Sequence, residues 1–176
     1  VSKRIISWLS NHQLTYENSK EEYRLKFDYI IQKQANHLLN EIKNSKELEN
    51  KLVGCAAIIL TGLTYQDNKN YLNNGLSILK KIIKSSIDNY GFPKSRNIKQ
   101  LCLYLKYFII IREWFKESQN DVPEYIDETI YYLGLSYAFI WQNIKQDLFF
   151  NGNYISNNEE FDPVSYTHLR AHETHE

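Results

Sequence analysis

Residues 54–60 read Gly-Cys-Ala-Ala-Ile-Ile-Leu, and this run decides the fold that the sequence predicts. The run lies within residues 47–65, a segment that is apolar on nearly every side of a helical wheel. A helix that is apolar all round is stable in water only when other parts of the chain cover it all round. The segment therefore predicts a buried central helix against which the rest of the chain packs.

The segments on either side have the apolar period of amphipathic helices, about 3.6 residues. Apolar side chains recur on one face of each of the residue ranges 3–11, 19–44, 69–87, 97–118 and 123–146. Ser19 with Glu22 has the spacing of a capping box at a helix start, and Asn97 with Gln100 repeats it. Pro123 suits the first turn of a helix. Because most connections are short, we expect an all-α fold of antiparallel helical hairpins.

Composition agrees with such a fold and narrows the classes of function. The chain has 176 residues, 43% of them hydrophobic, with only 6 Gly and 3 Pro, which suits one helical domain with a core. Its 21 Lys and Arg balance 21 Asp and Glu, so no net charge favours binding to nucleic acid or to an anionic membrane. The longest apolar stretches are also too short to span a bilayer. The chain opens without an initiator Met, which leaves the compartment open.

The two cysteines predict no special chemistry. Cys55 and Cys102 both lie within apolar runs. We expect buried free thiols that pack as small hydrophobic groups, in preference to a disulfide or a nucleophile.

The C-terminal residues 163–176 read Pro-Val-Ser-Tyr-Thr-His-Leu-Arg-Ala-His-Glu-Thr-His-Glu and are similar to a translated sequencing adapter. The preceding chain is rich in Asn, Lys, Ile and Tyr and holds only two histidines, whereas the tail alone supplies His168, His172 and His175. These three share one helical face and imitate a metal site, but their order is not that of the zincin motif. We therefore expect a domain over residues 1–162, a non-native tail over 163–176, and no bound metal or other cofactor.

Residues 90–97, Tyr-Gly-Phe-Pro-Lys-Ser-Arg-Asn, lead into a long helix that ends Ile-Arg-Glu-Trp-Phe-Lys-Glu at residues 111–117. This arrangement resembles the helical region of bacterial heparinase II/III-like proteins, in which a Gly-Gly-His-x-Ser-Arg-Asn/Ser-Pro loop precedes a similar helix. Three further segments are similar to that family in the same order: 7–11 (Ser-Trp-Leu-Ser-Asn), 121–125 (Asp-Val-Pro-Glu-Tyr) and 148–152 (Leu-Phe-Phe-Asn-Gly). Two positions depart from the pattern, with Phe92 in place of the loop His and Ile98 in place of Pro.

The resemblance implies part of an incomplete (α/α) toroid, followed in the family by an antiparallel β-sandwich domain that this chain lacks. It also implies β-elimination on uronate-containing polysaccharides. That chemistry needs donors that neutralise the uronate carboxylate, a His or Tyr that removes the C5 proton, and an acid for the departing oxygen. We expect the N-terminal helical part of a polysaccharide lyase, inactive by itself, whose partners are a uronate-containing polysaccharide and the missing β-sandwich domain.

Two other functions stay open at this point. A carbohydrate-binding or regulatory domain that kept the fold and lost the chemistry would be consistent with Phe92. An unrelated all-α protein-interaction module would need none of the family features.

The candidate substrate-binding residues are Ser95, Arg96 and Asn97 in the loop and Asn151 in the later turn. Arg96 could pair bidentately with a uronate carboxylate or could brace its own loop. Asn97 could donate to the carboxylate or could cap the helix that follows it.

The candidate catalytic residues are Asn36 and His37, because residues 36–39 (Asn-His-Leu-Leu) are similar to a helix motif of heparinase-like lyases in which the Asn faces the substrate carboxylate. The alternative is a polar pair on the shoulder of a helix. In an up-and-down helical series, the second of the helices ends at the same side as the loop at 88–96 and the turn at 149–153. Aromatic residues of the last helix could stack on sugar rings or fill the core: Tyr131, Tyr132, Tyr137 and Trp141.

We predict that deleting residues 163–176 leaves the helix content and the thermal midpoint unchanged, because the tail has no apolar period with which to dock. Circular dichroism of the two chains tests this. Added Zn²⁺ should also leave the midpoint unchanged. A loss of cooperativity on deletion, or a saturable shift with Zn²⁺, would show that the tail belongs to the native fold.

Overall fold

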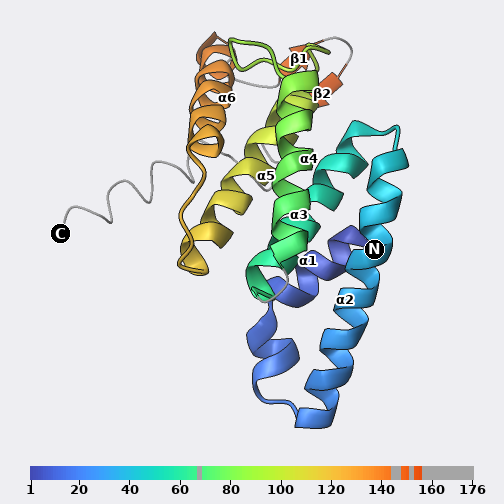
Figure 1. Ribbon diagram of the computed structural model, residues 1–176. Helices are drawn as coiled ribbons and strands as arrows, with labels where there is room; N and C mark the ends of the chain where they lie inside the picture. Colours follow the sequence, from blue (N-terminus) through green and yellow to red (C-terminus); the bar gives the residue numbers. More distant parts are fainter. Residues whose placement is uncertain (67–68, 144–147, 151–152, 156–176) are drawn as a thin grey trace, which may run out of the picture. The chain divides into compact units, whose positions relative to one another are not determined.

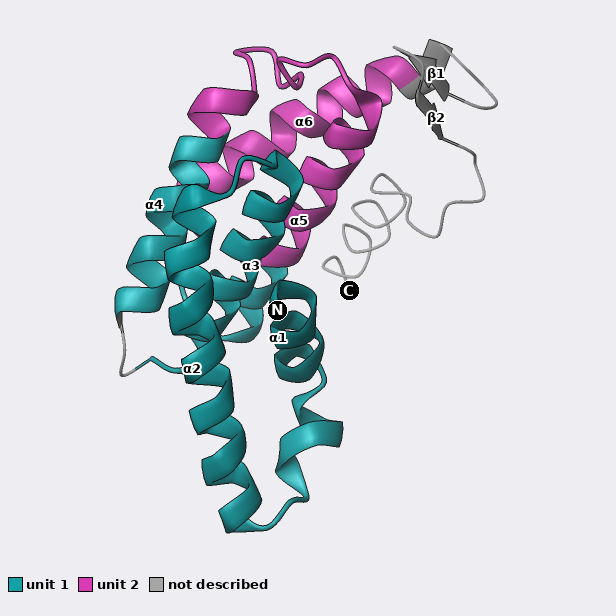
Figure 2. Ribbon diagram, turned by 90° about the vertical axis from the view of Figure 1, so that its right-hand side faces the viewer, with its two compact units in different colours: residues 1–82, 113–121 teal, residues 83–112, 122–176 magenta. Residues whose placement is uncertain are grey.

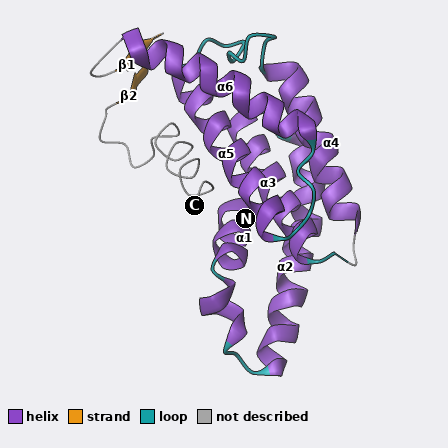
Figure 3. Ribbon diagram, turned by 90° about the vertical axis from the view of Figure 1, so that its left-hand side faces the viewer, coloured by secondary structure: helices purple, strands orange, loops and turns teal. Residues whose placement is uncertain are grey.

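The computed structural model describes residues 1–66, 69–143, 148–150 and 153–155, so the tail at 163–176 lies outside the described residues (Figure 1). Nearly all of the described chain is helical, as Figure 3 shows by colour. The helices are α1 (Ser2–Ser10), the short π-helix η1 (Gln13–Glu17), α2 (Glu21–Asn44), α3 (Leu48–Thr64), α4 (Lys69–Ser86), α5 (Ile98–Glu117) and α6 (Glu124–Asn143). The predicted all-α fold is confirmed, and each predicted helix is present.

A small antiparallel pair of strands follows α6. Strand β1 (Leu148–Phe150) pairs with β2 (Asn153–Ile155), with Leu148 opposite Ile155 and Phe150 opposite Asn153. The sequence predicted a turn here and not the strands around it. At three residues each, the strands do not alter the fold class.

The chain divides into two compact units, coloured separately in Figure 2. Unit 1 comprises residues 1–82 and 113–121, and unit 2 comprises residues 83–112 and 122–176. Helices α4 and α5 each contribute residues to both units.

The core of unit 1 is α3, as the run at residues 54–60 predicts. Every residue of α3 from 52 to 63 is buried. Helices α1 and α2 pack against α3, and their buried side chains are Ile5, Leu9, Phe27, Ile31, Ala35, Leu38 and Ile42. Cys55 is fully buried, and its thiol donates to the carbonyl oxygen of Gly75 on α4 at 3.1 Å. Burial raises the pKa of the Cys55 thiol, so the expectation of an inert buried thiol is confirmed.

Two glycines let α3 and α4 approach closely. A Cβ atom on Gly62 of α3 would lie 2.4 Å from the backbone nitrogen of Leu72 on α4. A Cβ on Gly75 of α4 would lie 2.6 Å from the Cγ1 atom of Ile59 on α3. Side chains at these two positions would therefore force the helices apart.

The core of unit 2 comes from α5 and α6, which run near each other in Figures 1 and 3. Ile98 is buried at the start of α5 and packs with the half-buried Cys102 and Ile140. Further buried hydrophobic residues of these helices within unit 2 are Leu101, Tyr104, Leu105, Phe108, Ile109, Ile111, Ile126, Ile130, Leu133 and Tyr137. Cys102 forms no disulfide, as predicted, but it is half-buried where the sequence predicted a buried thiol.

The predicted capping box at α2 is wrong. The N-cap of α2 is Lys20, which provides no side-chain cap. The hydroxyl of Ser19 instead donates to the carbonyl oxygen of Tyr16 in the unpredicted π-helix. Helix α5 ends in a Schellman arrangement. Gln119 has φ 56°, and the amide of Asn120 donates to the carbonyl oxygen of Phe115 at 3.0 Å.

We predict that Gly62→Ala destabilises the protein, although Ala is the better helix former, because its methyl group would meet the backbone of Leu72. Overpacking of this kind costs about 1–3 kcal/mol. Gly134→Ala is the matched control, since a Cβ there meets nothing within 4 Å on the helix α6. It should stabilise by up to about 1 kcal/mol. Urea unfolding followed by circular dichroism measures both, and shifts of the same sign would contradict the close approach.

Candidate functional site

The loop between α4 and α5, residues 87–97, is organised around the carboxylate of Asp88. Its Oδ1 accepts hydrogen bonds from the backbone amides of Tyr90 and Phe92, both at 2.9 Å. Its Oδ2 accepts from Nη1 of Arg96 at 2.6 Å, which is also an ion pair. The side chain of Asp88 is only 17% exposed. One carboxylate thus holds the beginning, middle and end of the loop together.

The loop is also fixed at its backbone and against α6. Gly91 has φ +81°, and a Cβ there would lie 2.3 Å from the carbonyl oxygen of Tyr132, so only glycine fits. The hydroxyl of Ser136 on α6 donates to the carbonyl oxygen of Tyr90 at 2.9 Å. An isolated antiparallel bridge joins Ile87 to Pro93. These contacts are made within unit 2 and hold the loop in one conformation.

The environment of Asp88 favours its ionised form. Burial alone would raise the pKa of Asp88, but the hydrogen bonds from the Phe92 and Tyr90 amides and from the Arg96 guanidinium outweigh burial. The pKa of this carboxyl therefore lies below its ordinary value.

Arg96 braces its own loop through Asp88 and remains half exposed, with 51% of its side chain accessible. Its φ of 57° is in the left-handed region, which is unfavourable for a residue with a Cβ. The guanidinium carbon lies 5.6 Å from the centroid of the Phe92 ring, a cation–π contact. The loop thus presents an aromatic ring and a cationic group side by side.

Ser95 and Asn97 cap α5. The Oδ1 atom of Asn97 accepts from the amides of Lys99 at 2.9 Å and Gln100 at 3.4 Å, so the predicted N-cap is confirmed. The Gln100 side chain does not reach back directly as in a capping box. Instead the hydroxyl of Ser95 donates to Oε1 of Gln100 at 2.6 Å and accepts from the Asn97 amide at 3.2 Å. Two of the predicted substrate-binding residues therefore have capping roles.

A cavity of about 270 Å³ opens beside this corner of the loop, within unit 2. Its walls are mostly carbon, and Arg96 is the only charged residue among those that line it in the described chain: Phe92, Pro93, Arg96, Asn97, Ile98, Leu101, Phe139 and Ile140. Phe139 of α6 is 65% exposed, so it offers a second phenyl ring to a ligand. Phe139 was not among the residues predicted from the sequence, because nothing in its distance along the chain indicates that it lies beside the loop. We call Phe92, Arg96 and Phe139 the loop corner.

Asn36 and His37 lie in unit 1, on α2, whereas the loop corner lies in unit 2. The Oδ1 atom of Asn36 accepts a hydrogen bond from the hydroxyl of Tyr71 at 2.9 Å. His37 is largely exposed, and its Nδ1 lies 3.3 Å from Oε2 of Glu41 one turn later. Both residues therefore have partners typical of a polar helix shoulder. Asn151, the remaining candidate, lies outside the described residues.

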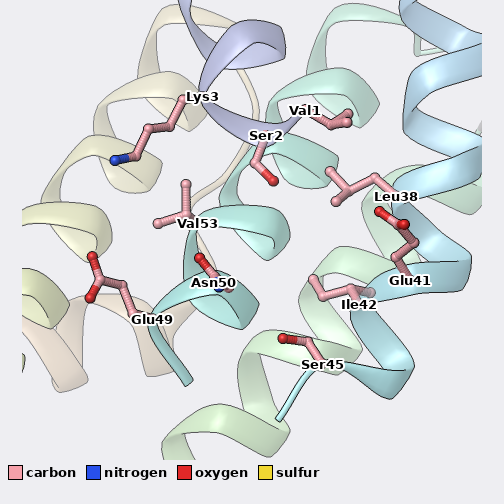
Figure 4. A pocket seen from close by; sticks show the side chains of 10 residues that line it. All are labelled: Val1, Ser2, Lys3, Leu38, Glu41, Ile42, Ser45, Glu49, Asn50 and Val53. Atoms are coloured by element: carbon pink, nitrogen blue, oxygen red, sulfur yellow. The ribbon is translucent and has the colours of Figure 1, made fainter. Parts of the chain in front are cut away.

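Glu41 also lines a cavity of about 430 Å³ between the start of α1 and the α2–α3 connection, shown in Figure 4. In that view Leu38 and Ile42 of α2 provide apolar wall, while Lys3 and Glu49 provide opposite charges. His37 is not among the lining residues. The cavity therefore does not bring His37, the candidate base, together with a group that could bind the uronate carboxylate. It does not support a β-elimination site in unit 1.

The tyrosines of α6 divide between core and surface. Tyr137 is 5% exposed and belongs to the core. Tyr131 and Tyr132 are 61% and 40% exposed, with ring centroids 5.4 Å apart in an edge-to-face arrangement. The side chain of Trp141 lies outside the described part. Two of the four predicted aromatics are thus available for stacking.

Other types of site find no support in the described residues. No group of His, Cys, Asp and Glu side chains there is placed to bind a metal ion. In residues 1–66 and 69–143, no helical segment combines bilayer-spanning length with enough hydropathy. Comparison of the chain with protein-family models, curated proteins and solved structures finds no match.

We predict that Asp88 makes the free energy of unfolding more sensitive to acid. A carboxyl whose folded pKa is lowered binds fewer protons in the folded than in the unfolded state, so its stabilisation is full above the unfolded pKa. It is lost as the pH falls below about 4 and through the folded pKa. The free energy of unfolding should therefore decrease less between pH 7 and pH 3 in Asp88→Asn than in the wild type. Glu128→Gln, which removes an exposed carboxyl of α6, is the control, and an equal effect of both changes would contradict this role.

Proposed function

We propose that this chain is the helical, substrate-binding part of a heparinase II/III-like polysaccharide lyase, and that the loop corner binds a uronate unit of the polysaccharide. The observation that carries this proposal is the guanidinium of Arg96 above the ring of Phe92 at the mouth of a mostly carbon-lined cavity. The resemblance of residues 90–97 to the Ser-Arg-Asn loop of that family supports the same assignment.

A uronate unit has the two chemical features that this corner matches. The carbon face of a pyranose ring packs on aromatic rings, here Phe92 and the exposed Phe139. The uronate carboxylate would accept charge-assisted hydrogen bonds from Arg96. Because Asp88 already fixes one edge of the guanidinium, the carboxylate would add to that pair and would not replace it. A donor held in place before binding loses little conformational entropy when the ligand arrives.

The loop corner supplies binding groups and no base. Phe92 occupies the position at which similar loops often carry His, and the described part of unit 2 contains no histidine. None of the three residues of the loop corner is the His or Tyr that the chemistry requires, so in this proposal the base that removes the C5 proton comes from outside the loop corner. The same observation favours a second candidate function, a carbohydrate-binding domain without catalysis.

We predict that the full chain binds oligogalacturonate in isothermal titration and that Arg96→Ala weakens this binding about tenfold or more, since a hydrogen bond to a charged group contributes about 1.5–3 kcal/mol. Arg96→Lys should recover only part of the affinity because an ammonium lacks the planar fork. Lys99→Ala, which removes another exposed charge three residues away, is the matched control and should bind as the wild type does.

A further variant separates ligand binding by Arg96 from its bracing role. Asp88→Asn keeps the guanidinium and weakens the brace, so it should retain binding if Arg96 contacts the uronate. If Asp88→Asn loses affinity as much as Arg96→Ala, the arginine acts only through the loop and the proposal is wrong. Formation of unsaturated uronate ends, followed by ultraviolet absorbance in the longer protein, decides between the lyase and the domain without catalysis.

A further inference from the structure

Unit 1 contains a second cavity whose chemistry is opposite to that of the loop corner. It has a volume of about 520 Å³ and lies among α1, η1, α2, α3 and the last turn of α5. Its walls include Phe27, Tyr65 and Trp114, of which Phe27 and Trp114 are buried to 7% and 8% exposure. We call this the aromatic pocket.

The polar centre of the aromatic pocket is the carboxylate of Asp28 on α2. Its Oδ2 accepts a hydrogen bond from the hydroxyl of Tyr16 at 2.9 Å, and its Oδ1 accepts from the hydroxyl of Tyr65 at 2.7 Å. The hydrogen bond to Asp28 and burial raise the pKa of Tyr16, and burial together with the same kind of hydrogen bond raises that of Tyr65. Both phenols therefore stay protonated and hold the carboxylate in place between them.

The acidic side chains that line the aromatic pocket give it negative charge, and Arg24 approaches from the ring of Tyr16. Glu117 at the end of α5 lines it together with Asp28, and no Lys or Arg is among its lining residues in the described chain. His12 also lines it, with Nε2 3.0 Å from Oε1 of Glu17. Each carboxylate oxygen of Asp28 can accept more than one hydrogen bond. A ligand that carries positive charge and hydrogen-bond donors would meet complementary groups here, whereas a uronate would be repelled.

The aromatic rings around this pocket already interact with cations of the chain itself. The guanidinium carbon of Arg24 lies 5.4 Å from the centroid of the Tyr16 ring, and that of Arg4 lies 5.5 Å from the centroid of Trp8. Trp8 and Tyr16 both pack against Phe27, with centroids 5.8 Å and 5.7 Å away. Faces of aromatic rings attract cations, and proteins recognise quaternary ammonium groups through such faces.

We propose that the aromatic pocket binds an organic cation, with the ammonium group between the carboxylates of Asp28 and Glu117 and its carbon substituents against Trp114, Tyr65 and Phe27. This site is independent of the proposed uronate site, because it lies in the other unit and selects the opposite charge. Failure of either proposal leaves the other unaffected.

The test compares choline with 3,3-dimethylbutan-1-ol, its neutral isostere, in titrations of the full chain followed by tryptophan fluorescence and by the thermal midpoint. Choline should give saturable binding, and the isostere should bind about tenfold more weakly or not at all, because it keeps the shape and loses the cation–π and ionic attraction.

Glu117→Gln removes an exposed charge without touching the core and should weaken choline binding several-fold. Asp28→Asn removes the negative charge but keeps Oδ1, which can still accept a hydrogen bond from a tyrosine hydroxyl. This variant should abolish the preference for choline over the isostere. Glu22→Gln, at an exposed position on the same helix α2 outside the pocket, is the matched control and should bind as the wild type does. Equal affinity for choline and its isostere, choline binding unaffected by both pocket variants, or preferential binding of a neutral oligosaccharide such as maltotriose would overturn the proposal.

Discussion

The constraint on which the structure most depends is the need to cover α3 on all sides. No residue from 52 to 63 reaches solvent to more than a small extent, so α1, α2 and α4 must each present an apolar face to it. Gly62 and Gly75 then set how near α4 comes, because the two backbones meet where side chains are missing. The hydrogen bond from the buried Cys55 thiol to Gly75 joins the same two helices. Helix α3 is therefore covered in two ways, by the apolar side chains of its neighbours and by the close approach of α4 at the two glycines.

Two carboxylates organise the two candidate sites in different ways. Asp88 gathers donors from its own loop, all within eight residues of it, and so presents a cation, Arg96, at the surface. Asp28 gathers phenols from positions 12 residues before and 37 residues after it, and so presents negative charge inside an aromatic pocket. The formal net charge of zero conceals this division, since it sums over surfaces of opposite character. Net charge therefore predicts solubility and nonspecific binding, but not the charge that a given site selects.

The helices could be predicted from the sequence because their signal is local. The apolar period places each helix, and the buried α3 and the Asn97 cap need only neighbouring residues. The Ser19 cap was predicted wrongly because the π-helix at 13–17 uses that hydroxyl, and nothing in the spacing indicates such a helix. The site was harder to predict because its contacts join distant residues. Arg96 was recognised as a candidate, but its pairing with Asp88, the position of Phe139 and the Tyr16–Asp28–Tyr65 cluster arise only when the chain folds.

The left-handed backbone of Arg96 has a consequence for how this loop would change under selection. At the C-terminal end of α5, Gln119 has a similar φ, and the hydrogen bonds of the helix end account for it. Arg96 adopts it at the end of a turn, where its amide donates to the carbonyl oxygen of Pro93 at 2.8 Å, and the conformation costs roughly 1–2 kcal/mol for a residue with a Cβ. Gly or Asn at this position would remove the backbone cost, but would also remove the ion pair with Asp88. Selection that retains the arginine acts on the guanidinium, either through its ion pair with Asp88 or through a ligand. Diverged sequences that keep Arg at position 96 but lose the carboxylate at position 88 would therefore indicate ligand recognition.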